Sequence, residues 1–152
     1  MRYRALVGLA ALSALLSGCG LFNGSDPEDD LKERRQAWLA LGINDYSFDF
    51  VRSCFCGGPA GRTLRIVVRS KQIVSVTDVQ TGGPPPFTPM AWAVTIDDFF
   101  VELQREINRG VDKIDFTFDP TFHFPTRVAI DRVKNAIDDE QAMSLSNFVS
   151  QR

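Results

Sequence analysis

A Gly-Gly-Pro-Pro-Pro run at residues 82–86 divides this 152-residue chain into two parts. Proline cannot donate a backbone hydrogen bond, so no strand inside a sheet can pass through this run. On each side of it the same patterns follow in order: a helical stretch that ends at a glycine, and three stretches in which apolar residues alternate. With an offset of 68 residues, Gly42 aligns with Gly110 and Phe48 with Phe116. The sequence therefore predicts two αβββ halves.

Capping residues mark the two predicted helix starts. Asp26 precedes a proline and three acidic residues, which suits the unpaired N–H groups and the positive end of a helix dipole. The second helix is predicted to start at Thr95. Gly42 and Gly110 are expected to end the helices. Helical spacing predicts an apolar face on the second helix at Ile96, Phe99, Phe100, Leu103 and Ile107.

The other apolar residues recur with period two, which is typical of half-buried strands. The predicted strands lie around residues 46–50, 64–68, 73–79, 114–118, 128–130 and 142–149. Their short connections favour antiparallel neighbours. We therefore predict a single α+β domain over residues 31–152 with the order αβββαβββ. Its mostly antiparallel sheet is expected to carry both helices on one face and to leave the other face in water.

The N-terminal residues predict a lipoprotein signal. Arg2 and Arg4 precede an apolar run at residues 5–16. This run is shorter than the roughly 20 residues that a membrane-spanning helix needs, but it suits the apolar part of a signal peptide. The four residues Leu16-Ser17-Gly18-Cys19 resemble a bacterial lipobox, whose cysteine receives a diacylglyceryl group.

The lipobox also predicts where the protein is located. Residues 1–18 are expected to be removed, which leaves Cys19 as the lipidated N-terminus and residues 19–30 as a tether. An anchor with two or three acyl chains would hold the domain stably at a membrane of the cell envelope. Gly20 after the lipidated cysteine resembles an outer-membrane address, so the domain of a Gram-negative protein would face the periplasm.

The charge balance argues against two classes of ligand. The chain has 17 Lys and Arg residues against 19 Asp and Glu residues, and cleavage of the signal peptide removes two of the arginines. The mature domain would then carry a net charge of about −4. Because it also has no run of basic residues, neither nucleic acid nor anionic lipid is predicted as a ligand.

Cys54 and Cys56 are the two cysteines that remain after lipidation of Cys19. In an oxidising compartment such a pair is predicted to form a disulfide. In a straight strand, the Cα atoms of two residues at i and i+2 lie near the largest separation that a disulfide permits. The chain would therefore have to bend, as the glycines after Cys56 allow. A redox-active pair that exchanges disulfides and a pair of free thiols remain as alternatives.

Several short motifs together resemble one known family. In order along the chain they are Tyr46-x-Phe48, Cys54-Phe55-Cys56, Thr95-x-Asp97, Pro125-Thr126-Arg127-Val128-x-Ile130-Asp131 and Asp138-Asp139-Glu140. This set is similar to an uncharacterised family of bacterial lipoprotein domains, known as domain of unknown function number six-one-seven-four, over roughly residues 30 to 150. Phe122-His123-Phe124 departs from it, because a glycine-containing turn is expected there. The resemblance implies no activity.

The motifs of common enzymes are weak in this sequence. His123 is the only histidine, and no glycine-rich phosphate-binding motif occurs. No catalytic residue, cofactor or resident metal is therefore predicted. Asp138, Asp139 and Glu140 could ligate a hard cation together with a further carboxylate, or bind an arginine of a partner. A solvated turn is the simpler interpretation of this acidic triplet.

The predicted function is a non-enzymatic binding or accessory module, whose partner is another envelope protein or a cell-wall component. The loop at residues 82–89 is a docking candidate, because prolines lower the ordering cost of binding and Phe87 and Trp92 offer aromatic anchors. A plain crossover between the halves is the alternative for this loop. The enzymatic alternatives are thiol–disulfide exchange through Cys54 and Cys56, or a metal-dependent hydrolase that uses the acidic triplet.

Overall fold

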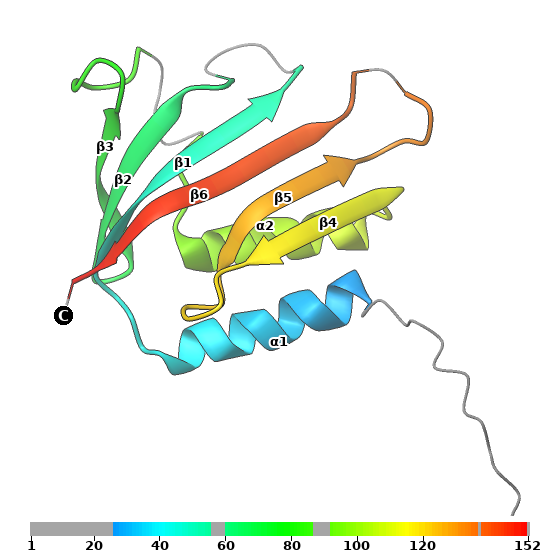
Figure 1. Ribbon diagram of the computed structural model, residues 1–152, viewed down its shortest axis with the longest axis horizontal. Helices are drawn as coiled ribbons and strands as arrows, with labels where there is room; N and C mark the ends of the chain where they lie inside the picture. Colours follow the sequence, from blue (N-terminus) through cyan, green and yellow to red (C-terminus); the bar gives the residue numbers. More distant parts are fainter. Residues whose placement is uncertain (1–25, 56–59, 87–91, 137, 152) are drawn as a thin grey trace, which may run out of the picture.

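The computed structural model describes residues 26–55, 60–86, 92–136 and 138–151. Its elements are α1 (Pro27–Ala40), β1 (Tyr46–Cys54), β2 (Thr63–Arg69), β3 (Gln72–Asp78), α2 (Ile96–Asn108), β4 (Lys113–Phe118), β5 (Pro125–Asp131) and β6 (Gln141–Ser150). The six strands form one antiparallel sheet in the order β3-β2-β1-β6-β5-β4. The predicted α+β class and the αβββαβββ order are confirmed (Figure 1).

Each half of the chain folds as one helix followed by a three-stranded meander. The two meanders meet where β1 pairs with β6, so that Phe50 lies opposite Leu145. β3 and β4, which follow one another as strands in the sequence, lie at opposite edges of the sheet, and α2 comes between them along the chain (Figure 1). The centre of the sheet is therefore built from the first and the last strand.

The predicted helix ends are confirmed. The Asp26 side chain accepts the backbone N–H two residues later at 2.9 Å, and Thr95 accepts the N–H three residues later at 3.0 Å. Gly42 and Gly110 follow the helices with φ angles of +63° and +75°, a conformation that favours glycine. Since α1 starts at Pro27, residues 27–30 belong to the helix and not to the predicted tether. Among the described residues, neither helix is long and apolar enough to cross a bilayer.

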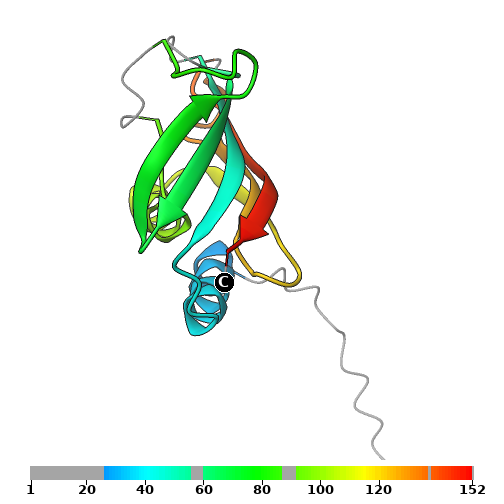
Figure 2. The same ribbon diagram turned by 90° about the vertical axis from the view of Figure 1, so that its left-hand side faces the viewer.

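Both helices pack against one face of the sheet. Figure 1 looks onto the opposite face, with α2 behind the strands and α1 along the β4 side, and Figure 2 gives the view at right angles. Trp38 of α1 packs edge-on against Tyr46 and Phe124, at centroid distances of 5.6 and 6.0 Å. Phe99 of α2 packs edge-on against Phe50 at 5.7 Å. Aromatic side chains thus join both helices to the inner face of the sheet.

Tyr46 also fixes the start of α2. Its hydroxyl accepts a hydrogen bond from the Ile96 N–H at 3.0 Å. Ile96 is the first residue of α2, where the helix itself offers no acceptor for the N–H group. Burial raises the pKa of the Tyr46 hydroxyl well above its ordinary value, so the group stays neutral. The position of β1 therefore determines where α2 begins.

The open face of the sheet carries an ionic contact with a buried carboxylate. The Asp49 carboxylate binds the Arg65 guanidinium through two contacts, one of them 2.9 Å between Oδ2 and Nη2, and accepts a hydrogen bond from Asn147 at 2.7 Å. This contact joins β1 to β2 and β6. The Arg65 hydrogen bonds lower the pKa of Asp49, whose side chain is only 4% exposed.

Candidate binding site on the open face

A row of small side chains crosses the open face of the sheet. Ser53 of β1 lies opposite Ala142 of β6, Ala142 lies opposite Ala129 of β5, and Ala129 lies opposite Asp115 of β4. All four residues are exposed, and three of the four side chains are small. The row therefore forms a low floor that spans four strands.

A second row of residues on each side flanks this floor, and most of their side chains are longer than those of the floor. One flank consists of Phe55, Glu140, Asp131 and Lys113, and the other of Val51, Ser144, Arg127 and Thr117. At about 3.3 Å per residue along a strand, the two flanks lie ~13 Å apart. A cavity of about 540 Å³ lies on the side of the first flank and one of about 400 Å³ on the side of the second, and Ser53 and Ala142 line both. We call this feature the open-face groove.

The charges of the open-face groove are not balanced. Lys113 lies opposite Asp131 in the register, but its ammonium group contacts Asp115 at 2.7 Å. The hydrogen bond and charge of Asp115 and, more weakly, the charge of Asp131 raise the pKa of Lys113. No basic nitrogen of the described residues lies within 4.0 Å of a carboxylate oxygen of Asp131 or Glu140. The groove therefore contains two carboxylates without an ion-pair partner in this part of the structure.

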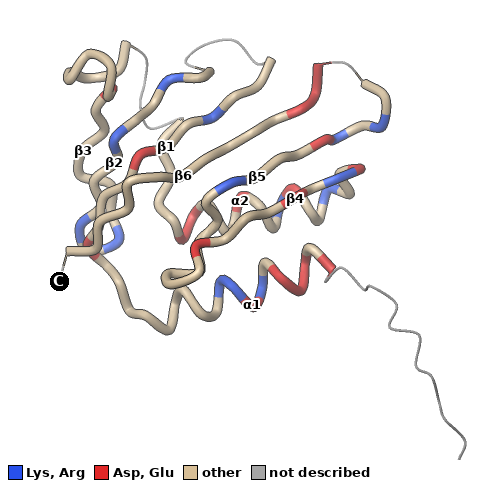
Figure 3. The backbone as a smooth tube through the Cα atoms, viewed as in Figure 1, with Lys and Arg blue, Asp and Glu red and all other residues tan. Residues whose placement is uncertain are grey.

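The acidic character extends from the groove to the start of α1. The first turn of α1 contains three acidic residues, and Figure 3 shows red segments at the start of α1, the end of β5 and the start of β6, all at the same end of the molecule. Asp26 lines a further hollow together with Lys113 and Asp115 of the groove. The start of α1 therefore lies beside the groove.

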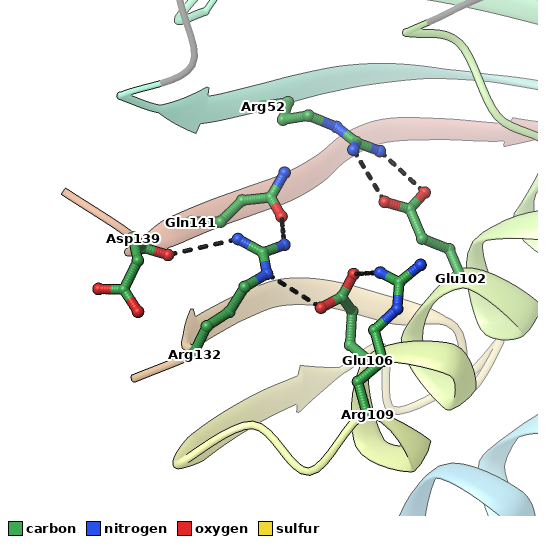
Figure 4. A network of polar contacts seen from close by, with 7 residues as sticks. All are labelled: Arg52, Glu102, Glu106, Arg109, Arg132, Asp139 and Gln141. Carbon is green, nitrogen blue, oxygen red and sulfur yellow. Dashed lines mark hydrogen bonds and ion pairs between the residues drawn. The ribbon is translucent and has the colours of Figure 1, made fainter. Parts of the chain in front are cut away.

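On the inner face at this end of the sheet, charged side chains are paired (Figure 4). Arg52 of β1 donates to both carboxylate oxygens of Glu102 in α2 at 2.8 Å. Its guanidinium lies 5.6 Å from the Phe50 ring and 6.0 Å from the Trp92 ring. Trp92, a predicted docking anchor, is half-buried here and packs against the core. Phe87 lies outside the described residues, so the docking role of the proline-rich loop remains a prediction.

A second group of the same network surrounds Glu106. This carboxylate is nearly buried and contacts Arg109 at 2.8 Å and Arg132 at 3.1 Å. Arg132 also donates to the Gln141 side chain at 2.7 Å and to the Asp139 backbone carbonyl at 3.3 Å (Figure 4). These contacts join the end of α2 to β6 and to the turn before it. Their chemistry is that of a structural network, in which the carboxylates of Glu102 and Glu106 each bind a guanidinium.

The three residues of the predicted acidic triplet lie in different surroundings. Asp138 is exposed, and the Asp139 carboxylate accepts the Val133 N–H at 2.5 Å within the turn between β5 and β6. Glu140 alone lines the open-face groove. The described residues contain no group of three or more His, Cys, Asp or Glu side chains arranged to hold a metal ion.

Cys54 is the last residue of β1 and lines the groove cavity. Cys56 and Cys19 lie outside the described residues. The disulfide between Cys54 and Cys56 and the lipidation of Cys19 therefore remain predictions.

His123 lies in the turn between β4 and β5, and its φ angle is +65°. The Asp119 carboxylate accepts the N–H groups of Thr121 and Phe122 in the same turn, at 2.8 and 2.7 Å. A glycine would adopt this conformation without strain, which accounts for the expectation of a glycine in this turn. The His123 Nδ1 accepts a hydrogen bond from Arg34 at 3.4 Å, so the histidine connects the turn to α1.

Sequence reasoning missed most of the groove. Ser53, Ala129 and Ala142 carry no motif, and Asp131 was noted only as the end of a family pattern. The available signal was the alternation of the strands, which assigns the odd residues 127, 129 and 131 to the face opposite Val128 and Ile130. Only the pairing of β5 with β6 brings these residues beside Ala142.

Residues 30–150 match the sequence profile of a family described as Family of unknown function (DUF6174). Neither the comparison with curated proteins nor that with solved structures gives a match.

Proposed function

The chain belongs to the family of unknown function DUF6174, and from this premise we propose that it is a lipid-anchored protein of the bacterial cell envelope that binds a partner through the open-face groove. In this proposal the domain is a binding or accessory module and not an enzyme. The observation that carries the proposal is the groove itself: a floor of small side chains across four strands, with two carboxylates that lack ion-pair partners among the described residues.

The lipobox supports the membrane location. Cys19 precedes Pro27 by eight residues, and an extended chain of that length reaches at most about 28 Å. A lipid on Cys19 would therefore keep the start of α1 close to the membrane surface. Because α1 starts beside the groove, the groove would face the narrow space next to the membrane. In a Gram-negative cell this space would be the periplasmic side of the outer membrane.

The rigidity of the sheet supports a binding role. The residues of the groove lie on or next to strands that are hydrogen-bonded to neighbours over most of their length, from Val51–Ser144 to Thr117–Arg127. A surface whose backbone is already ordered loses little conformational entropy when a partner binds. Less of the free energy gained from contacts with the partner is then offset by the cost of ordering this surface.

We also propose that Cys54 and Cys56 form a disulfide. The bridge would enclose Phe55, whose side chain is 72% exposed at the flank of the groove, and would restrict the position of this aromatic ring. Alkylation of the unreduced and the reduced protein, followed by mass spectrometry, tests the bridge. Alkylation of both cysteines without reduction would contradict it. Ready reduction by a mild thiol would favour the exchange alternative over a structural bridge.

The anchor is tested by metabolic labelling with an alkyne analogue of palmitate and by fractionation of the cells. The wild-type chain is expected to carry the label and to sediment with membranes, whereas Cys19→Ser is expected to lose both properties. Label on the Cys19→Ser variant, or soluble wild-type protein, would contradict the anchor.

The binding surface is tested by a photocrosslinking amino acid in the lipidated protein. Thr117 is exposed on the flank of the groove, and Gln36 is exposed on α1 and serves as the matched control. We expect a discrete adduct from position 117 that is absent from position 36 and is lost in the Cys19→Ser background. Equal adducts from both positions, or none from position 117, would contradict a partner on the open face.

A further inference from the structure

We propose that the open-face groove binds a basic segment of a partner protein, with one Arg or Lys side chain placed between Asp131 and Glu140. This inference rests on the proposed function and deepens it, because it names the chemistry of the partner. It predicts that basic residues of the partner determine the affinity and that they bind at the flank of the groove that contains Asp131 and Glu140.

The first argument is electrostatic. Ile130 lies opposite Gln141, the first residue of β6, so Asp131 at the end of β5 and Glu140 just before β6 lie at the same end of the groove. Like charges opposite one another on neighbouring strands destabilise a sheet. Both carboxylates line one cavity, and neither has an ion-pair partner among the described residues. A cation between them would remove this repulsion.

The second argument concerns the kind of cation. The described residues contain no group of three or more His, Cys, Asp or Glu side chains arranged to hold a metal ion, whereas Ca²⁺ takes six to eight oxygen ligands. A guanidinium or ammonium group needs fewer acceptors. A guanidinium in particular can donate to two carboxylates at once, because its five N–H groups point in different directions.

The third argument comes from the apolar surface beside the carboxylates. Ala129 and Ala142 form the floor, and Phe55 stands exposed at its flank. The methylene stem of an Arg or Lys side chain can lie on such a floor while its charged group reaches the carboxylates. The Phe55 ring offers a further contact to the cation.

The groove also sets the size and direction of the segment. A cavity of about 540 Å³ lies within the range of 300–1,000 Å³ that is usual for ligand pockets, so it can hold a side chain together with its backbone. The second cavity continues over the same floor toward Arg127. Arg127 repels a second basic residue on that flank, and we therefore expect a segment that is basic at one end and neutral or acidic at the other.

The same charges argue against a lipid surface as the occupant. The acidic residues at the start of α1, together with Asp131 and Glu140, lie at one end of the molecule. An anionic membrane surface would repel this end. We therefore expect a protein segment and not a lipid headgroup in the groove.

The test is a binding titration of the full-length lipidated protein in a neutral detergent. The probes are three fluorescent peptides that differ at one central position: Ala-Ala-Arg-Ala-Ala, the same peptide with Glu, and the same peptide with norleucine. We expect the Arg peptide to bind more tightly than both others and to lose affinity at high salt. Equal binding of the three peptides, or tighter binding of the protein to anionic vesicles than to neutral ones, would overturn the proposal.

Variants locate the binding. Asp131→Asn together with Glu140→Gln is expected to weaken binding of the Arg peptide by about tenfold, whereas Asp138→Asn, a charge removal at an exposed residue outside the groove, is expected to change nothing. Ala142→Leu fills the floor and should weaken binding by at least the same factor. Ser146→Leu, at an exposed residue of the same strand outside the groove lining, is its control. An unchanged affinity in the double variant or in Ala142→Leu would overturn the proposal.

The two proposals fail in different ways. A specific photocrosslink from position 117 without discrimination between the three peptides would leave the open face as a binding surface but would remove the basic partner. Absence of the photocrosslink would contradict the proposed function itself.

Discussion

Two neighbouring residues at the end of β5 are used in opposite ways on the two faces of the sheet. The Arg132 side chain lies on the inner face, where it contacts Glu106, Gln141 and the backbone of Asp139. Asp131 lines the groove on the open face and has no ion-pair partner among the described residues. Strand alternation therefore lets one end of the sheet hold the fold together on one face and present carboxylates without ion-pair partners on the other.

The difference follows from burial. Glu106 is 5% exposed, and a carboxylate removed from water costs several kcal/mol unless it is paired. Glu106 accordingly contacts two guanidinium groups, and Glu102 beside it contacts one. Glu140 is exposed and Asp131 half-buried, so water can solvate both carboxylates and neither requires a partner for folding.

The largest effect is expected from Glu106→Gln. This change keeps the shape of the side chain but leaves Arg132 and Arg109 without a counter-charge. Because these two arginines are 37% and 68% exposed, we expect a loss of about 2 kcal/mol in the free energy of unfolding and not the full cost of an isolated buried charge. Urea unfolding measures the loss. The control is Glu33→Gln at an exposed position of α1, for which we expect the free energy of unfolding to change by no more than about 0.5 kcal/mol.

The Glu106→Gln result would contradict the comparison if the variant were as stable as the Glu33→Gln control. In that case the inner network would contribute no more to the fold than an exposed charge, and the contrast between the two faces would disappear.

A smaller effect, which depends on pH, is expected from Asp49→Asn. The Arg65 hydrogen bonds lower the pKa of Asp49, so its stabilising contribution is present above the unfolded pKa of about 3.9 and is lost as the pH falls through the lower folded value. Asp49→Asn should therefore be about 1 kcal/mol less stable than wild type at pH 7, and this difference should shrink below about pH 4. Unfolding curves from pH 3 to pH 7 measure it. A difference that stays constant over this range would disprove the assigned contact.

The smallest effect on stability is expected from Asp131→Asn together with Glu140→Gln. Since the two carboxylates repel one another and have no ion-pair partner among the described residues, their removal should leave the unfolding free energy unchanged or raise it by about 0.5 kcal/mol. The gain should disappear at high salt, where the repulsion is screened. A loss of more than about 1 kcal/mol would show that these residues hold the fold together, as those on the inner face do.

The elements of the fold were predictable because they depend on local spacing. The caps at Asp26 and Thr95, and the inward positions of Tyr46, Phe48 and Phe50, follow from residues close together in the sequence. The alternation of the strands also predicted that one face of the sheet would remain in water.

The open-face groove was not predictable from the sequence, because it depends on long-range register. Ser53 meets Ala142 only because the first strand pairs with the last. The acidic triplet was a poor guide for the same reason: of its three residues only Glu140 lines the groove, and its neighbour there is Asp131, on a different strand. Adjacent residues of a strand point to opposite faces of the sheet. Residues that are far apart in the chain can lie side by side on one face when their strands are neighbours.

The most direct test measures the unfolding free energy of the full-length protein with and without a saturating amount of the Arg peptide. We predict that wild type gains stability from the peptide, as mass action requires for a ligand of the folded state. The Asp131→Asn, Glu140→Gln variant should be at least as stable as wild type without the peptide and gain less from it, by about 1.4 kcal/mol for a tenfold weaker affinity. The account would be contradicted if the variant were less stable than wild type, or if the peptide stabilised both proteins equally.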